Sequence, residues 1–196
     1  MNKKFAAIIV FGLTMTTCAS PAIGEVRTNK TVTYDSQINT SGMIPMLKEQ
    51  KAKQTKLEKD AKIAKDLQSN TLLMKQALKN LNKHVQKTWY VFSGSTPSGW
   101  DCSGMTMWFY EQLGINLVHR ASVQDQSGVE TNTPKPGDLV IFKYTNSNQA
   151  YHVGIYIGNG EMIHAPRNGE VTRVENVETF GGNYSKISYR RIVNTN

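Results

Sequence analysis

The segment Gly99-Trp100-Asp101-Cys102-Ser103-Gly104 places a cysteine where a loop passes into an amphipathic helix. The apolar residues that follow recur at helical spacing and form one face, and Gly114 then supplies a stop signal. The residues of this face are Met105, Trp108, Phe109 and Leu113. Asp101 is a favoured N-cap residue. The segment therefore predicts a helix that begins at Cys102.

The predicted position of Cys102 suits a catalytic thiol. In the first turn of a helix, unpaired backbone N–H groups and the helix dipole favour a negative charge. A free thiol titrates near ~8.5, and a helix N-terminus with a cationic histidine nearby lowers this pKa to roughly 3.5–7.5. We therefore expect a thiolate at neutral pH. A lone cysteine more often packs as a small hydrophobe, but the flanking glycines and Ser103 indicate a junction near the surface.

Residues 1–24 have the pattern of a signal peptide. Two lysines precede the apolar run 5–13, which is too short to span a bilayer, and small residues at Ala22 and Gly24 can end the signal. No later segment approaches the roughly 18 apolar residues of a membrane span. We expect an exported protein of the periplasm, extracellular space or cell wall, without a membrane span.

The two cysteines have different expected fates. Lipid attachment at Cys18 is an alternative to removal of the signal, but Met15-Thr16-Thr17 lacks the small residue typical of a lipoprotein signal at that point. If Cys18 leaves with the signal, Cys102 has no internal disulfide partner. It is then either an intermolecular partner or a reactive group.

The chain carries a formal net charge of +8. A basic exported protein is attracted to nucleic acid or to anionic envelope polymers. The sequence shows neither a nucleic-acid motif nor a basic stripe interleaved with aromatic residues. We therefore expect anionic envelope polymers, and not nucleic acid, as partners.

The sequence divides into segments of different character. Residues 25–45 are polar and rich in turn-forming types, which predicts a flexible linker. Residues 46–70 carry a thin apolar stripe among many charges, which predicts a charged helical segment for reach, self-association or a plain solvated surface. Beyond it, Met74, Leu78, Leu81 and Val85 form a broader stripe that faces a core. The compact domain is predicted to span 71–196.

The second half of the chain predicts strands. The ranges are a buried strand at 139–142, a hairpin of 152–157 and 161–165, and further strands at 171–174 and 187–193. A short helix is expected at 122–126. Helices packed on an antiparallel sheet give an α+β fold class.

A catalytic thiol needs a basic partner, which in turn needs a polar group to orient it. His152 and His164 lie in the predicted hairpin, whereas His84 and His119 are expected to be ordinary surface or boundary residues. If the loop is Gly158-Asn159-Gly160, both hairpin histidines point to one side of the sheet, with room left by Gly154. A loop of only Asn159-Gly160 would separate them unless a bulge intervened. We predict the three-residue loop and the shared face.

Three ordered motifs resemble the NlpC family of papain-like cell-wall cysteine peptidases, which are peptidoglycan endopeptidases. They are the stretch from Tyr90 to Asp101-Cys102-Ser103-Gly104, then Pro136-Gly137-Asp138-Leu139, then His152-Val153-Gly154-Ile155-Tyr156-Ile157-Gly158. The resemblance covers residues 72–193. It implies a papain-like domain that cleaves stem peptides, typically between D-glutamate, through its γ-carboxyl, and diaminopimelate or lysine.

The resemblance also implies roles for single residues. Cys102 would be the nucleophile, His152 the base and acid, and His164 the orienting residue, with the Cys102 backbone N–H in the oxyanion hole. The positions expected to shape the substrate groove are Tyr90, Asp101, Ser103, Arg120 and Ser122. No metal or other cofactor is required, although Cys102, His152 and His164 are possible ligands by type.

Two other functions remain open at this point. An amidase or acyltransferase could use the same scaffold, because thioester chemistry does not dictate the acceptor. A non-catalytic wall-binding protein could retain the fold and use residues 46–70 as its working surface.

Overall fold

A computed structural model describes residues 40–195 of the chain. The predicted signal peptide, Cys18 and most of the predicted linker lie outside the described residues. Residues 45–195 belong to one compact unit, and the described residues before it, 40–44, are helical. The helices are α1 (Thr40–Asn82), α2 (Cys102–Glu111), α3 (Ala121–Gln124), α4 (Val177–Gly181) and the 3₁₀ turn η1 (Gly182–Tyr184).

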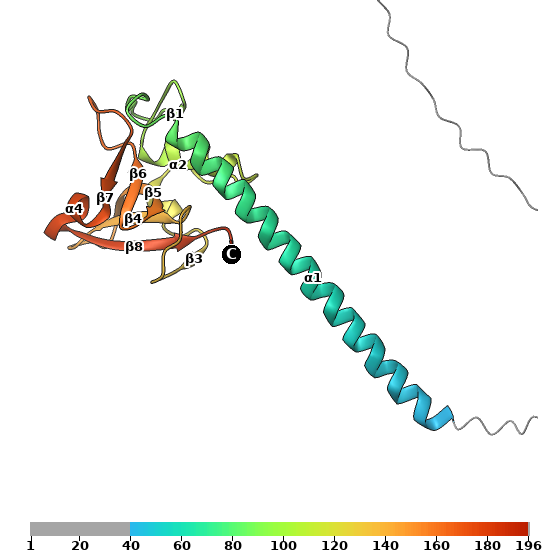
Figure 1. Cartoon of the computed structure of the whole chain (residues 1–196). Coiled ribbons are helices and arrows are strands. Elements are labelled where there is room, and N and C mark those ends of the chain that lie inside the picture. Colours follow the sequence, from blue (N-terminus) through green and yellow to red (C-terminus); the bar gives the residue numbers. More distant parts are fainter. Residues whose placement is uncertain (1–39, 196) are drawn as a thin grey trace, which may run out of the picture. The chain divides into compact units, whose positions relative to one another are not determined.

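The strands form one large and one small antiparallel sheet (Figure 1). The small sheet pairs β1 (Ser95–Thr96) with β2 (Gly99–Trp100). The strands of the large sheet are β3 (Val129–Glu130), β4 (Leu139–Tyr144), β5 (Ala150–Gly158), β6 (Glu161–His164), β7 (Arg173–Asn176) and β8 (Ser185–Arg191). They lie in the order β3-β8-β4-β5-β6-β7. The predicted α+β class, with helices on an antiparallel sheet, is confirmed.

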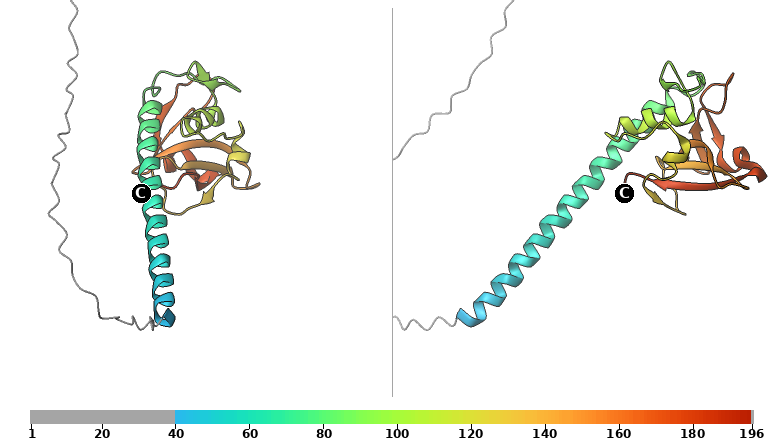
Figure 2. Two further views of the ribbon diagram at one scale, coloured as in Figure 1. Left: turned by 90° about the vertical axis from the view of Figure 1, so that its right-hand side faces the viewer. Right: turned by 180° about the vertical axis from the view of Figure 1, so that it is seen from behind.

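Strand β4 shows how the sheet separates two apolar clusters. Leu139 and Ile141 join the larger cluster, which includes residues of α1 and α2, two helices that lie on the same side of the sheet (Figure 2). The alternate residues Val140 and Phe142 join a smaller cluster with Val177 of α4. Because both faces of β4 are covered, its sequence is a continuous apolar run.

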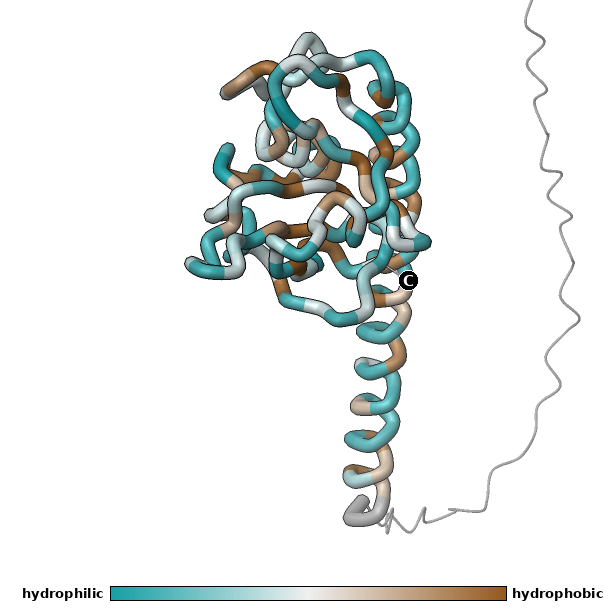
Figure 3. The backbone as a smooth tube through the Cα atoms, turned by 90° about the vertical axis from the view of Figure 1, so that its left-hand side faces the viewer, coloured by the Kyte–Doolittle hydropathy of each residue, from teal (hydrophilic) through white to brown (hydrophobic). Residues whose placement is uncertain are grey.

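Helix α1 joins two segments that the sequence predicted separately. It begins at Thr40, within the predicted linker, and continues through the charged segment into the core-facing stripe. Met74 and Leu81 are buried, whereas Leu57 keeps 64% of its surface exposed. Figure 3 shows the alternation of hydrophilic and hydrophobic residues along this helix. Within residues 40–195, no helix combines the length and apolar character needed to cross a bilayer.

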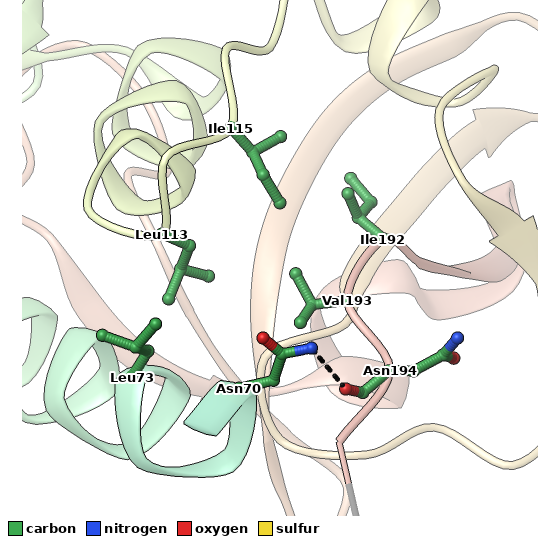
Figure 4. A pocket seen from close by; sticks show the side chains of 7 residues that line it. All are labelled: Asn70, Leu73, Leu113, Ile115, Ile192, Val193 and Asn194. Carbon is green, nitrogen blue, oxygen red and sulfur yellow. Dashed lines mark hydrogen bonds between the residues drawn. The ribbon is translucent and has the colours of Figure 1, made fainter. Parts of the chain in front are cut away.

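The C-terminal segment packs against α1 and the end of α2. Asn70 Nδ2 donates to the carbonyl oxygen of Asn194 at 3.2 Å (Figure 4). Beside this bond lies a pocket of about 250 Å³. Its apolar lining comes from Leu73, Leu113, Ile115, Ile192 and Val193.

The turn of the β5–β6 hairpin is shorter than predicted, but the two histidines still lie on one face of the sheet, as predicted. Gly158 pairs with Glu161, so the turn is only Asn159-Gly160, and the three-residue loop was wrong. Both turn residues have positive φ, 54° and 75°, as a tight hairpin turn requires. The extra residue is absorbed by a bulge between Tyr156 and Gly158. The bulge restores the register in which both histidines share a face.

The ends of the predicted strands differ from those observed, most clearly in β7 and β8. The strand expected at 171–174 is β7, which starts at Arg173, because Thr172 hydrogen-bonds instead to Thr88 and Gln86 through its backbone. The strand expected at 187–193 begins earlier, at Ser185, because that residue pairs with Tyr144 of β4. The expected helix at 122–126 is α3 at Ala121–Gln124.

Leu81→Ala should destabilise the domain far more than Leu57→Ala, although both lie in α1. Leu81 is 0% exposed, so its truncation removes buried surface and leaves a cavity, at a cost of about 2–5 kcal/mol. Leu57→Ala should change the free energy of unfolding by less than about 0.5 kcal/mol. Urea denaturation followed by circular dichroism measures both, and equal effects would contradict the assigned core.

Candidate active site

Asp101 organises the loop-to-helix junction at Cys102. As N-cap of α2 it adopts an extended backbone, with φ −90° and ψ −178°, and its Oδ1 accepts the Gly104 N–H at 2.8 Å and the Ser103 hydroxyl at 2.9 Å. Its Oδ2 accepts the backbone N–H of Ser93 at 3.1 Å. The predicted cap and helix start are therefore present in the structure.

Gly104 allows the first turn of α2 to approach the preceding loop. A Cβ at this position would lie 2.0 Å from the carbonyl oxygen of Gly94. Any side chain would force the helix and the loop apart. The close contact explains why a glycine follows Ser103 at the start of the helix.

Cys102 lies at the start of α2, half-buried against β5. The backbone N–H groups of Val153, Ser103 and Cys102 itself act on the sulfur and lower its pKa. Val153 directly follows His152 along β5, so the sulfur lies beside the strand segment that carries this imidazole. The structure thus places the predicted nucleophile next to the strand that carries the predicted base.

The thiol is nevertheless not the thiolate that the sequence predicted. Burial, followed by the nearby Asp101 carboxylate, raises the pKa of Cys102 to about 11. The helix N-terminus and the three N–H groups favour the anion, but they are outweighed by desolvation and by a like charge. Cys102 is therefore protonated at neutral pH.

His152 and His164 form a hydrogen-bonded pair on one face of the sheet. His152 Nε2 and His164 Nδ1 lie 2.9 Å apart, with the rings perpendicular at 87°. The space for this arrangement comes from Gly154, where a Cβ would lie 3.2 Å from His164 Cβ. The predicted shared face and the predicted role of Gly154 in leaving room both match this geometry.

Both imidazoles are held neutral. Burial, and then His164, lowers the pKa of His152 well below its ordinary value, although Asp101 acts in the opposite direction. Burial, and then Arg173, lowers the pKa of His164 to about 3. The Phe180 ring covers the pair, with centroids 4.7 Å from His152 and 4.6 Å from His164. At neutral pH the site contains a thiol and two uncharged rings.

A groove of about 420 Å³ opens at Cys102. Its lining includes every position predicted to contact substrate, namely Tyr90, Asp101, Ser103, Arg120 and Ser122. The pKa of Tyr90 is raised, first by burial and then by Cys102 and Asp101. The Tyr90 phenol therefore lies within electrostatic reach of the sulfur.

His119 is part of this groove, although the sequence assigned it no role. Its Nε2 lies 2.9 Å from Asp101 Oδ1, and the side chain is one of those that line the groove. The signal available in the sequence was its position next to Arg120. His84, by contrast, packs edge-on against Trp100 and Trp108, each at a ring separation of 5.2 Å.

Glu175 is the second residue that sequence reasoning missed. Its Oε2 lies 3.1 Å from His164 Nε2, the ring nitrogen that does not face His152. The same oxygen accepts from Arg173 Nε at 2.8 Å. Among residues 40–195, the cysteine, histidine and carboxylate side chains form no group of three suited to a metal ion.

A thiol at the N-terminus of a helix, next to an antiparallel sheet that carries a pair of histidines, is the arrangement of the papain-like class of α+β domains. The sequence model of the NlpC/P60 family matches residues 87–193, more than half of the chain. The protein belongs to the NlpC/P60 family.

Relatives of known name share this domain. The "probable endopeptidase p60" of Listeria monocytogenes is 36% identical over 112 residues, which is 56% of this chain but only 22% of that protein. The NlpC/p60 domain of the peptidoglycan hydrolase SagA is 31% identical, with a TM-score of 0.51, over 59% of this chain and 96% of that domain. RipD of Mycobacterium tuberculosis, described as a non-catalytic NlpC/p60 domain protein, shares the fold at 18% identity and a TM-score of 0.52, over 62% of this chain and 98% of RipD.

The protonated thiol predicts a particular pH dependence of alkylation. Iodoacetamide reacts with the thiolate, so the rate at Cys102 should rise about tenfold per pH unit from pH 7 to pH 10, without a plateau. Mass spectrometry of the Cys102 peptide separates this reaction from modification at Cys18. A rate that is already constant between about pH 5 and pH 8 would indicate a thiolate–imidazolium pair and contradict the neutral site.

Asp101→Asn should make the thiol more acidic while keeping the helix cap, because asparagine is also a good N-cap residue. Removal of the carboxylate that raises the pKa of Cys102 should lower that pKa and accelerate alkylation severalfold at pH 9. Glu111→Gln, at the far end of α2, removes the same charge and serves as the control. An unchanged or slower rate in Asp101→Asn would refute the electrostatic role of Asp101.

Proposed function

We propose that this protein is a cysteine peptidase that hydrolyses the stem peptides of peptidoglycan. The observation that carries the proposal is the position of the Cys102 sulfur, beside the strand that presents His152, at the floor of an open groove. Membership of the NlpC/P60 family and the names of its relatives support the same substrate class.

The first half of the reaction starts from a neutral thiol. As the Cys102 sulfur attacks the scissile carbonyl carbon, its proton passes to His152, and the carbonyl oxygen becomes an oxyanion. Backbone N–H groups at the start of α2, including that of Cys102, are suited to stabilise this oxyanion. When the intermediate collapses, the C–N bond breaks, and the leaving amine takes the proton from His152.

The second half releases the thioester. Water attacks the acyl carbon while His152 accepts a proton from it, and the C–S bond then breaks. The sulfur recovers the proton, so the enzyme returns to its starting state. His164 orients the His152 ring in both halves, through the 2.9 Å contact between their nitrogens.

The groove carries charges that suit a stem peptide. Arg120 offers a guanidinium for a substrate carboxylate, and Asp101 offers a carboxylate for an ammonium group. Tyr90, Ser103 and Ser122 add hydroxyl groups to the same lining. With the family resemblance, this supports cleavage between the γ-carboxyl of D-glutamate and diaminopimelate or lysine.

We also propose export to the cell wall, directed by the signal sequence at 1–24. Lysines 48, 51, 56 and 59 line one shallow surface of α1 and are exposed. Such a surface attracts anionic envelope polymers at low ionic strength. The charged part of α1 would then hold the enzyme near its substrate.

Digestion of purified muropeptides tests the activity. The protein should release fragments with a new D-glutamate γ-carboxyl end and a new amine on diaminopimelate or lysine, identified by mass spectrometry. Cys102→Ala should abolish the products, because the lining of the groove contains no second thiol. Glu111→Ala, on the exposed end of α2, should retain full activity.

Other results would assign a different function. Release of intact stem peptide from the sugar would indicate an amidase. Cleavage that persists in Cys102→Ala would remove the proposed mechanism. Binding of peptidoglycan without any cleavage by the unaltered protein would indicate a wall-binding protein, as RipD is described.

A further inference from the structure

A chain of hydrogen bonds continues from the histidine pair to β7. His152 Nε2 contacts His164 Nδ1 at 2.9 Å, and His164 Nε2 contacts Glu175 Oε2 at 3.1 Å. In the pairing of β7 with β6, Glu175 lies opposite Met162, and His164, two residues further along β6, lies opposite Arg173. None of the three hydrogen-bonded side chains is among the residues that line the groove at Cys102. Glu175 contacts the His164 nitrogen that does not face His152.

The Glu175 carboxylate is held in place from its other side. Its Oε2 accepts from Arg173 Nε and Arg173 Nη2, both at 2.8 Å. Arg173 Nη1 also contacts Glu170 at 2.7 Å, and Glu170 contacts Arg167 at 2.7 Å. A carboxylate paired with a guanidinium accepts hydrogen bonds and donates none. His164 Nε2 must therefore carry the proton in this contact.

The proton positions along the chain follow in order. A neutral imidazole has one N–H and one bare nitrogen, so His164 Nδ1 is bare and accepts from the Nε2–H of His152. His152 Nδ1 is then also bare. His152 Nδ1 is the nitrogen left to receive the thiol proton. The Glu175 carboxylate, at the other end of these hydrogen bonds, thus selects the tautomer of His152 that a base requires.

Burial removes the alternatives to this arrangement. The His164 side chain is 0% exposed, and Phe180 covers both rings. Water therefore cannot replace Glu175 as a partner without opening the cluster. If water reached the His164 ring, it could accept from or donate to either nitrogen equally well, and neither tautomer would be favoured.

The same carboxylate has a second effect during the reaction. When His152 accepts the thiol proton, it becomes a cation in a poorly solvated place. Its Nε2–H then donates more strongly to His164, and His164 donates more strongly to Glu175. The Glu175 carboxylate stabilises the His152 cation only while that cation forms. It therefore lowers the activation barrier and leaves the affinity for substrate unchanged.

We propose that Glu175 is a positioning residue which, through His164, fixes the tautomer of His152 and stabilises its protonated form. Within the reaction, this proposal rests on the peptidase function. The tautomer itself can be measured without any substrate. Failure of the peptidase proposal and failure of this one are therefore distinguishable.

Three variants separate the role of the acceptor from that of the ion pair. Glu175→Leu removes the acceptor and the charge, whereas Glu175→Gln keeps an oxygen acceptor and removes the charge. Arg173→Gln breaks the ion pair but keeps the carboxylate. Glu178→Leu, on the exposed surface of α4, is the matched control for replacing a glutamate near β7.

The first measurement is long-range ¹H–¹⁵N correlation of the imidazole nitrogens in the full chain. The unaltered protein, Arg173→Gln and Glu178→Leu should all show His164 and His152 protonated at Nε2 only. Glu175→Leu should show mixed tautomers, and Glu175→Gln should retain the Nε2–H form. An unchanged tautomer in Glu175→Leu, or a different tautomer in the unaltered protein, would overturn the proposal.

The second measurement is muropeptide hydrolysis. Glu175→Leu should lower kcat about 10- to 100-fold with little change in KM, and Glu175→Gln should fall between it and the unaltered enzyme. Arg173→Gln should lose less activity than Glu175→Leu. If Arg173→Gln and Glu175→Leu lose activity equally while the tautomers stay unchanged, the pair only supports the fold of β7, and the proposal is wrong.

Discussion

The site depends on one carboxylate, that of Asp101. Its two oxygens take the N–H of Gly104, the hydroxyl of Ser103, the N–H of Ser93 and the ring of His119. The first turn of α2, the loop before β1 and the segment before α3 are thereby tied to a single side chain. The position of the sulfur relative to β5 follows, because Cys102 is the next residue in the chain.

The same carboxylate opposes the charge that the helix N-terminus would favour. The Cys102 thiol is half-buried between a helix end and a strand. The solvation energy that its thiolate form loses there exceeds the stabilisation by the N–H groups of the first turn. At neutral pH the site therefore holds a protonated sulfur and uncharged imidazoles. In the proposed reaction, charge develops only when the thiol proton passes to His152, where fixed dipoles and buried rings take the place of water.

Local patterns predicted much of this protein. The spacing after Cys102 and the cap at Asp101 define α2. The shared face of the two histidines was predicted from a three-residue loop, and it is met because a bulge in β5 compensates for the shorter turn. The thiol's protonation state could not be predicted, because it depends on how β5 desolvates the helix end, a contact between residues far apart in sequence. Glu175 and His119 were missed for the same reason. Each acquires its partner only when separate segments meet, although Arg173 and Glu175 alternate on β7 as residues that share one face do.

The hairpin bulge has a consequence for how this region tolerates change in length. The pairs Ile155–Ile163 and Tyr156–Met162 set the register, and they lie in the packed part of the sheet, whereas Ile157 is the surplus residue taken up next to the turn. Loss of that one residue would leave a regular ladder with the same partners, so the imidazoles would stay where they are. The tip of the hairpin is thus free to vary by a residue, while an insertion between Gly154 and Tyr156 would turn one ring to the opposite face.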